Sequence, residues 1–224
     1  MFEVKGGGRR WGRVLGLAIV LALTAVTASP VQSFAAARGE AMAAKAQPRG
    51  SVYLFLGLLN VFSTGLDTLS GELQAKGVPN TVMNYGGWMG AAARVEARYA
   101  KDRLRTRPIV LIGHSFGADA AISMSAALAR KNIPVDLVVL FDATARQPVP
   151  ANVRHLINFY SASDGIGKIL RPAAGFHGRI DNVNIDKLHE DIGHLNIEKQ
   201  ESLHKRVIRA VLALYGRGAR VSSK

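Results

Sequence analysis

The chain has 224 residues, of which 48% are hydrophobic and 20% are charged, with no cysteine and a formal net charge of +13. This length predicts about one domain, and the apolar fraction excludes a wholly disordered chain. The lack of cysteine excludes disulfides, thiolate metal sites, a cysteine nucleophile and a lipid anchor on cysteine. The positive charge fits nucleic acid, an anionic membrane surface or no specific partner.

The first segment has the pattern of an export signal. Basic residues come first, at Lys5, Arg9, Arg10 and Arg13, and an apolar run from Val14 to Ala28 follows. With the small residues after it, this order is typical of a secretory signal peptide over residues 1–37, cleaved after Ala35 or Ala37. An uncleaved membrane anchor is the alternative, although the apolar run is shorter than the roughly 20 residues of a spanning helix.

Cleavage would produce a periplasmic or secreted protein. Residues 1–37 contain four basic residues and one acidic residue, so their removal lowers the net charge to +10. The mature chain would begin with a flexible, polar, alanine-rich lead-in over residues 38–50. What remains is enough for one sizeable core.

From residue 51 onward, strand patterns alternate with helix patterns. The expected strands are Ser51–Gly57, Thr81–Tyr85, Pro108–Gly113, Val135–Phe141, His155–Tyr160 and Ile180–Ile185. The expected helices are Thr64–Lys76, Ala91–Leu104, Phe116–Lys131 and Ile197–Tyr215, the last capped by Gly216. This alternation predicts an α/β domain over residues 51–224, with a mostly parallel central sheet of about six strands and helices on both faces.

The most informative motif lies where the third expected strand meets the next helix. Gly113-His114-Ser115-Phe116-Gly117 is a Gly-x-Ser-x-Gly sequence between a buried strand and a helix, and in this setting the serine sits on a strained turn. The glycines allow neighbouring backbone to approach closely. The turn also directs the Phe116 N–H and the helix N-terminus toward the position of a developing oxyanion. Ser115 is therefore the candidate nucleophile.

This motif in its strand–turn–helix setting resembles the α/β-hydrolase superfamily, in particular its small lipase and thioesterase-like members. The resemblance covers most of Ser51–Gly216, where six of the fold's usual eight strands are visible, and no large lid is expected. It implies that a catalytic acid and then a histidine follow Ser115 in the chain. It also implies a second oxyanion donor after the first strand, for which the Leu58 N–H is the candidate. The family often has His-Gly there, whereas this chain has Leu56-Gly57.

The base and the acid are sought among residues that follow strands. A general base must lie on a loop above the strand ends, within reach of Ser115. His194 lies after the last expected strand and before the final helix, which matches the family position, and His189 in the same loop is the alternative. Asp142 directly follows the fourth strand, and Asp164 follows the fifth. Both acid positions occur within the superfamily, and we prefer Asp142 because Asp164 lies in a turn-like sequence.

Other classes of function fit the sequence less well. Several residues of metal-binding types lie late in the chain, but their spacing matches no known ligand pattern: His177, Asp181, Asp186, His189, Asp191 and His194. The basic residues are spread along the chain without an aromatic stacking motif, so we expect no nucleic-acid partner. The main alternative is a non-catalytic hydrolase-fold protein that binds an anionic envelope lipid or polymer through its basic surface.

The sequence therefore predicts an exported serine hydrolase that cleaves a carboxylic ester or thioester through an acyl-enzyme, without a metal or cofactor. Ser115 is the expected nucleophile, His194 the base and Asp142 the acid that orients it. A lipid or other acyl ester is the expected substrate. Transfer of the acyl group to another alcohol is an open alternative, because acyl-enzymes catalyse both reactions.

Overall fold

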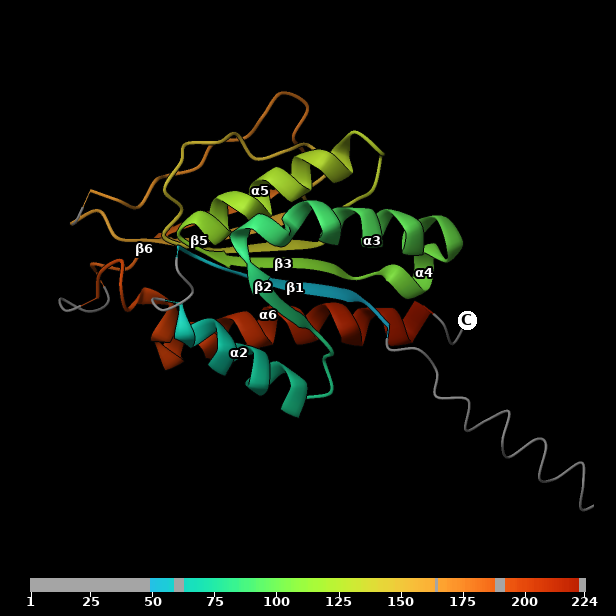
Figure 1. The fold of residues 1–224 in the computed structure, drawn as a ribbon, viewed down its shortest axis with the longest axis horizontal. Coiled ribbons are helices and arrows are strands. Elements are labelled where there is room, and N and C mark those ends of the chain that lie inside the picture. The colour runs from blue at the N-terminus through green and yellow to red at the C-terminus, as the bar shows by residue number, and fades with distance from the viewer. Residues whose placement is uncertain (1–48, 59–62, 164, 188–191, 222–224) are drawn as a thin grey trace, which may run out of the picture. The chain divides into compact units, whose positions relative to one another are not determined.

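The central sheet is parallel throughout. The computed structural model describes residues 49–58, 63–163, 165–187 and 192–221, and these form a six-stranded sheet in the order β2-β1-β3-β4-β5-β6 (Figure 1). The strands are β1 (Ser51–Leu56), β2 (Thr81–Asn84), β3 (Ile109–His114), β4 (Leu137–Phe141), β5 (His155–Tyr160) and β6 (Arg179–Asn184). Every pairing is parallel, which confirms the predicted sheet. The strand order reverses between β1 and β3, and ligands of such sheets bind beyond the carboxyl ends at the reversal.

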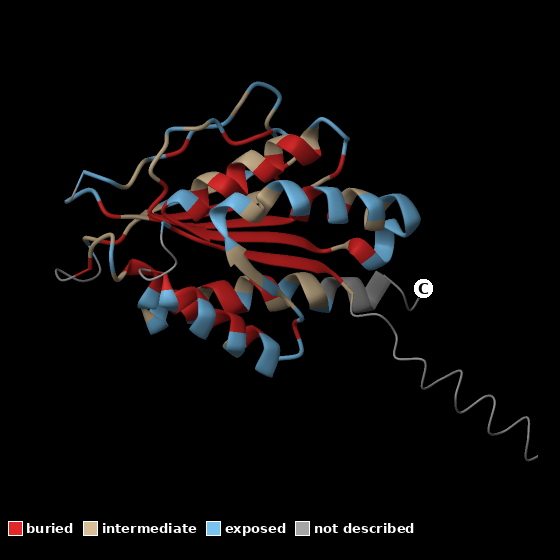
Figure 2. Ribbon diagram, viewed as in Figure 1, coloured by how far each residue is buried: buried red, intermediate tan, exposed pale blue. Residues whose placement is uncertain are grey.

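Helices cover both faces of the sheet, as Figure 2 shows. In the described part of the chain, α3 (Trp88–Lys101) and α5 (Phe116–Ala129) pack on one face, and α2 (Thr64–Ala75) and α6 (Glu201–Val221) pack on the other. Shorter helical turns are η1 (Tyr85–Gly87), α4 (Arg103–Thr106) and η2 (Ile197–Lys199). Because both faces are covered, the central strands β3 and β4 are buried along their whole length.

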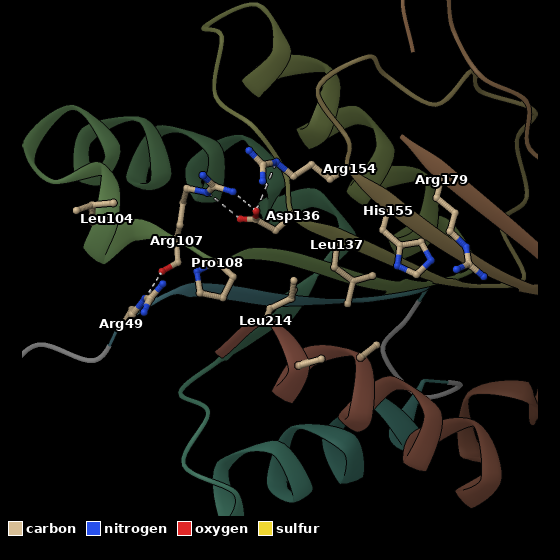
Figure 3. A pocket seen from close by; sticks show the side chains of 12 residues that line it. Arg49, Leu104, Arg107, Pro108, Asp136, Leu137, Arg154, His155, Arg179 and Leu214 are labelled. Carbon is tan, nitrogen blue, oxygen red and sulfur yellow. Dashed lines mark hydrogen bonds and ion pairs between the residues drawn. The ribbon is translucent and has the colours of Figure 1, made fainter. Parts of the chain in front are cut away.

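Asp136 connects the amino ends of two neighbouring strands. It directly precedes β4 and accepts a hydrogen bond from the backbone N–H of Ile109 in β3 at 2.9 Å. Both Nε and Nη2 of Arg107 also donate to this carboxylate (Figure 3). The paired hydrogen bonds to Asp136 raise the pKa of Arg107. This buried carboxylate therefore holds the β3 and β4 starts in register.

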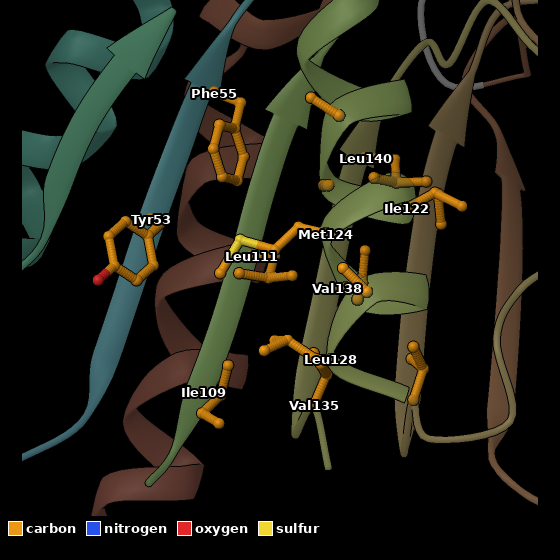
Figure 4. Close-up of a cluster of buried hydrophobic side chains, with 14 of the residues drawn as sticks. Tyr53, Phe55, Ile109, Leu111, Ile122, Met124, Leu128, Val135, Val138 and Leu140 are labelled. Atoms are coloured by element: carbon orange, nitrogen blue, oxygen red, sulfur yellow. The ribbon is translucent and has the colours of Figure 1, made fainter. Parts of the chain in front are cut away.

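The alternation of side chains along each strand divides the core into two clusters. Tyr53 and Phe55 of β1 belong to the cluster beneath α3 and α5, whereas Val52 and Leu54 belong to the cluster against α2 and α6. Figure 4 shows part of the first cluster, with labelled side chains from β1, β3, β4 and α5. These two layers fix the positions at which β1, β3 and β4 end.

The helix predicted over Ala91–Leu104 is two helices. The structure has α3 from Trp88 to Lys101 and the single turn α4 after it, separated by Asp102. Asp102 has an extended backbone, with φ −153°, and its side chain accepts the N–H of Arg105 at 2.9 Å. Because Asp102 serves as the N-cap of α4, it also ends α3.

The final helix also differs from the prediction. The expected helix over Ile197–Tyr215 is divided into the 3-10 turn η2 and the helix α6, with Gln200 in an extended conformation between them. Gly216 was predicted to cap this helix, but α6 continues through it to Val221. Gly216 lacks the positive φ of a C-capping glycine, and a glycine inside a helix costs only about 1 kcal/mol relative to alanine.

None of the helices in the described ranges has the length and apolar character needed to cross a bilayer. The predicted signal peptide over residues 1–37 lies outside these ranges, as does most of the predicted lead-in over residues 38–50. Both assignments stay predictions.

Candidate active site

Ser115 occupies a strained turn between β3 and α5. Its φ of 57° and ψ of −126° lie where non-glycine residues are rarely found. Its N–H donates to the carbonyl of Phe141 in β4 at 3.0 Å, and its own carbonyl accepts the N–H of Ala118 at 2.9 Å. The turn is therefore held on both sides, and it places Ser115 at the N-terminus of α5.

Glycine is required on both sides of this turn. A Cβ atom on Gly113 would overlap the carbonyl oxygen of Gly117, and a Cβ on Gly117 would overlap the carbonyl oxygen of Phe55 in β1. These neighbours are backbone atoms, which cannot turn aside as a flexible side chain can. The two glycines thus permit the close backbone approach that the motif predicts.

Three residues far apart in sequence form one chain of hydrogen bonds. His194 Nε2 lies 3.0 Å from Ser115 Oγ, and His194 Nδ1 lies 2.6 Å from Asp142 Oδ2. With Asp142 ionised, Nδ1 carries the proton and donates to the carboxylate, so Nε2 accepts the hydrogen bond from the Ser115 hydroxyl. The structure therefore brings together the three residues that the sequence singled out as nucleophile, base and acid.

Asp142 is fully buried and held in one orientation. Its Oδ1 accepts the backbone N–H of Ser161 at 2.9 Å, while Oδ2 faces His194. A Cβ on Gly167 would overlap Oδ1, so the loop after β5 needs a glycine where it passes the carboxylate. Sequence reasoning missed Gly167. The alternative acid, Asp164, and the alternative base, His189, both lie outside the described residues.

Two backbone N–H groups beside Ser115 are candidates for an oxyanion hole. Phe116 is the first residue of α5, so its N–H has no acceptor within the helix and carries part of the positive end of the helix dipole. Gly57, just after β1, lies against the nucleophile, because a Cβ on Gly57 would stand 3.1 Å from Ser115 Cβ. This contact brings the next residue, Leu58, to the edge of the site.

A second chain of buried hydrogen bonds runs behind the nucleophile. The Gly57 N–H donates to Ser63 Oγ at 2.9 Å, and Ser63 Oγ lies 2.8 Å from His114 Nδ1. On the other side of the ring, His114 Nε2 lies 2.8 Å from the carbonyl oxygen of His194. A carbonyl can only accept, so Nε2 carries the proton and Nδ1 accepts from the Ser63 hydroxyl.

His114 therefore joins the loop of Gly57 to the loop of His194. Burial lowers the pKa of His114 to about 4, which keeps the ring neutral near pH 7. The sequence shows His114 only as the residue before the nucleophile in the motif, so this role was not predicted. Ser63 had no sequence signal beyond its place before a helix.

Glu198 is a buried carboxylate next to this chain. Among the described residues neither carboxylate oxygen has a hydrogen-bond partner; Oε1 lies 3.9 Å from Lys199 Nζ and Oε2 lies 4.0 Å from His114 Nε2. Burial raises the pKa of Glu198 to about 7. The residue is held through its backbone instead, because its carbonyl accepts from His204 Nε2 at 2.7 Å and packs directly on Gly65.

Apolar side chains surround the polar centre of the site. A cavity of about 390 Å³ adjoins His194, with Ile166 and Leu195 in its lining, and both side chains are partly exposed. Phe116 is also exposed, and its ring contacts the exposed ring of Tyr85 with 5.7 Å between the centroids. A rim of this kind suits a substrate with an apolar portion.

Two further histidines of the described residues are paired away from the site. His155 Nε2 lies 2.9 Å from Asp181 Oδ2, and His204 Nδ1 lies 2.9 Å from Glu72 Oε2. Across the part of the chain that the structure describes, no three histidine or acidic side chains are grouped so that they could hold a metal ion.

Comparisons with known proteins found structural matches to α/β hydrolases at low sequence identity. No family model matches the chain, and no curated protein matches it. The thioesterase domain of NocB from the nocardicin cluster is 15% identical, with a TM-score of 0.46, and the match covers 75% of this chain and 95% of that chain. The esterase domain of a Rhodothermus marinus protein is 20% identical, with a TM-score of 0.44, over 78% of this chain and 88% of that chain.

A third match is YbtT, a type II thioesterase from the yersiniabactin biosynthetic pathway. It is 11% identical, with a TM-score of 0.43, over 74% of this chain and 94% of that chain. At these identities and TM-scores the likeness concerns the fold and carries no weight for function. The function of this chain is therefore inferred from the geometry of its own site.

Proposed function

We propose that this protein is a serine hydrolase that cleaves a carboxylic ester or thioester through an acyl-enzyme. The observation that carries the proposal is the hydrogen-bonded series of Ser115, His194 and Asp142, with contacts of 3.0 Å and 2.6 Å. Both distances lie in the range needed for a base to activate a hydroxyl and for an acid to orient that base.

In the acylation step, Ser115 Oγ attacks the carbonyl carbon of the substrate while its proton moves to His194 Nε2. The carbonyl oxygen becomes an oxyanion, which the N–H groups of Phe116 and Leu58 would stabilise together with the N-terminus of α5. The tetrahedral intermediate collapses as Nε2–H protonates the leaving alcohol or thiol, and the acyl group stays on Ser115 as an ester.

In the deacylation step, a water molecule takes the place of the leaving group. His194 Nε2 removes a proton from the water, and the water oxygen attacks the acyl carbon. Ser115 Oγ then leaves and takes the proton back from His194, which releases the carboxylic acid and restores the enzyme. An alcohol in place of water would give acyl transfer through the same steps.

Asp142 has a positioning and electrostatic role in both steps. Its carboxylate accepts the Nδ1–H of His194, holds the ring in one tautomer and stabilises the imidazolium that forms. The bond from Ser161 to the other carboxylate oxygen keeps that orientation fixed.

The proposed substrate is a lipid or other acyl ester or thioester with an apolar acyl chain. The support is the exposed apolar rim formed by Leu58, Tyr85, Phe116, Ile166 and Leu195. Burying apolar surface contributes about 25 cal/mol per Å², so longer acyl chains should bind more tightly. A series of p-nitrophenyl esters tests this, and kcat/KM is expected to rise from acetate to octanoate. A preference for acetate would contradict the acyl-chain assignment.

Export is part of the proposal and rests on the signal-like pattern of residues 1–37. A protein expressed in a Gram-negative host should be recovered from the periplasm, and its intact mass should correspond to a chain that begins after Ala35 or Ala37. Recovery of the full-length mass from the membrane fraction would contradict cleavage.

Labelling with a fluorophosphonate tests the hydrolase itself. We expect one label on Ser115 and none in Ser115→Ala, and we expect His194→Ala and Asp142→Asn to slow labelling by about 1,000-fold. The matched control is Asp164→Asn, the other candidate acid, which should label at the wild-type rate.

Circular dichroism of each variant shows whether it is folded. A folded wild-type protein that is not labelled would contradict the hydrolase proposal. A larger loss from Asp164→Asn than from Asp142→Asn would overturn the assignment of the acid alone.

A further inference from the structure

A second cavity lies at the amino ends of β3 to β6 (Figure 3), whereas Ser115 follows the carboxyl end of β3. Its volume is about 690 Å³. Four arginines line it, Arg49, Arg107, Arg154 and Arg179, and they are spread along this edge of the sheet (Figure 3). Apolar residues also line it, among them Ala210, Ala213 and Leu214 of α6. None of these residues takes part in the proposed hydrolase chemistry.

The four arginines come from four separate segments of the chain. Arg49 precedes β1, Arg107 precedes β3, Arg154 precedes β5 and Arg179 begins β6. The fold brings them together, since the Arg179 N–H donates to the Arg154 carbonyl at 2.9 Å and Arg49 Nε donates to the Arg107 carbonyl at 3.0 Å. Their position at one end of the sheet is set by the order of the strands and not by a basic run in the sequence.

Three of these guanidinium groups are held by one nitrogen only. Arg49 uses Nε for the Arg107 carbonyl, and Arg179 uses Nε for Asp181 Oδ1 at 2.8 Å. Arg154 Nε forms a longer ion pair with Asp136 Oδ1 at 3.8 Å. Among the described residues, no hydrogen bond engages the Nη groups of these three side chains. The groups are thus oriented by Nε and keep their other donors for a ligand.

The nearby acidic residues do not balance the charge. Asp136 and Asp181 are the carboxylates that pair with these arginines in the described part of the chain, and Arg107 already engages Asp136 through two nitrogens. Four guanidinium groups and two carboxylates give a net charge of +2. His155, which also forms a hydrogen bond with Asp181, is not included in this count.

We infer that this cavity binds an organic phosphate, namely a phosphate ester with a short apolar group. A phosphate monoester carries a charge of about −2 near pH 7 and has three peripheral oxygens, which match two excess positive charges and donors from separate segments. The apolar side chains of α6 would contact the hydrocarbon of the ester. The inference stands independently of the proposed hydrolase activity.

Isothermal titration calorimetry with soluble dihexanoyl phosphatidic acid tests this site. The Ser115→Ala protein is used as the background, so that ester hydrolysis contributes no heat. We expect a Kd below about 1 mM, competition by inorganic phosphate, and weaker binding of glycerol 3-phosphate, which lacks the apolar chains. Dihexanoyl phosphatidylcholine, whose headgroup has no net charge, should not bind.

Two arginine variants and a matched control locate the binding. Arg154→Gln and Arg179→Gln should each weaken binding by about tenfold, since each removes charge-assisted hydrogen bonds. Their side chains are 59% and 72% exposed, so both variants are expected to fold, and thermal unfolding checks this. The control is Arg130→Gln, an exposed arginine after α5 that does not line the cavity.

Four outcomes would overturn the inference, the fourth of them in its apolar part. The first is no binding at about 5 mM ligand. The second is equal weakening by Arg130→Gln, which would indicate a diffuse attraction to the basic surface. The third is binding to phosphatidic-acid vesicles without binding of the soluble lipid, which would indicate a membrane surface. Equal affinity for glycerol 3-phosphate would remove the apolar group from the ligand and leave a site for phosphate alone.

Discussion

Replacing His114 by alanine tests whether the buried chain of hydrogen bonds behind Ser115 positions the catalytic histidine. The change removes two buried contacts of 2.8 Å, one to Ser63 Oγ and one to the carbonyl oxygen of His194. Each buried group left without a partner costs about 1–3 kcal/mol, and the space left by the ring adds to this. We therefore expect the free energy of unfolding to fall by about 4 kcal/mol.

The same change should slow the reaction of Ser115. In the variant the His194 carbonyl loses its hydrogen bond to His114 of β3. The His194 ring must nevertheless stay within hydrogen-bond reach of Ser115 Oγ, which lies 3.0 Å from Nε2 in the wild-type protein. A displacement of about 1 Å costs about 100-fold in rate. Urea unfolding followed by circular dichroism measures the stability, and fluorophosphonate labelling below the unfolding transition measures the rate.

His114→Gln is the matched variant, because its side-chain amide can donate to the His194 carbonyl as the imidazole does. It should recover much of the labelling rate that His114→Ala loses. The reasoning would be refuted if His114→Ala were destabilised as expected but labelled at the wild-type rate. That result would give His114 a role in folding and none in positioning His194.

Four further substitutions are expected to act on stability, and urea unfolding measures each. Gly117→Ala should cost more than about 3 kcal/mol, because its methyl group overlaps backbone, whereas Gly71→Ala, with no atom within 4 Å of the new methyl group, should stabilise α2 by about 0.5–1 kcal/mol. Burial raises the pKa of Glu198 to about 7. The free energy of unfolding should therefore fall by about 3 kcal/mol as pH rises from about 4.5 to above 7, because the buried carboxyl must then ionise. Glu198→Gln should remove this fall and be more stable than the wild type at about pH 8. Arg107→Met leaves the buried Asp136 carboxylate without its paired donor and should cost about 3 kcal/mol or more.

Each of these predictions has a result that would contradict it. A fully stable Gly117→Ala protein would show that β1 can move away from the turn. If Glu198→Gln kept the pH dependence of the wild type, other groups would be responsible for that dependence. Wild-type stability in Arg107→Met would show that the Ile109 N–H and Arg154 are enough to hold Asp136.

The strands and the place of Ser115 could be predicted because their signals are local. β3 is an uninterrupted apolar run that leads into Gly113, and the strand–turn–helix setting makes the serine motif specific. Asp142 and His194 could be proposed because loops after parallel strands meet at one edge of the sheet. Their mutual distances required the packed structure.

The boundaries of the helices depend on contacts that a hydrophobic pattern does not show. Asp102 reads as one more polar residue on an exposed helix face, yet its carboxylate caps the next helical turn. Gly216 reads as a stop, yet α6 continues because nothing at that position requires a left-handed backbone. At Asp102 the deciding interaction is a hydrogen bond from a backbone N–H to its carboxylate. At Gly216 no left-handed residue is needed, so the helix continues.

The buried polar residues behind the site gave the weakest sequence signals. Ser63 precedes α2 and reads as an N-cap, but its hydroxyl bonds Gly57 and His114 and makes no cap hydrogen bond. Glu198 reads as a solvent-facing residue of an amphipathic stretch. Its burial arises only when η2 packs on the start of α2, which is distant in sequence.

The strained turn has a practical consequence for a chain without cysteine. The strain lies in the backbone and is set by Gly113 and Gly117, so the side chain at position 115 can change while the turn keeps its shape. Ser115→Cys would give the chain its single thiol, at a helix N-terminus that favours the thiolate. One electrophilic dye or crosslinker would then attach at one known atom, and the mouth of the site could be followed by spectroscopy without any knowledge of the substrate.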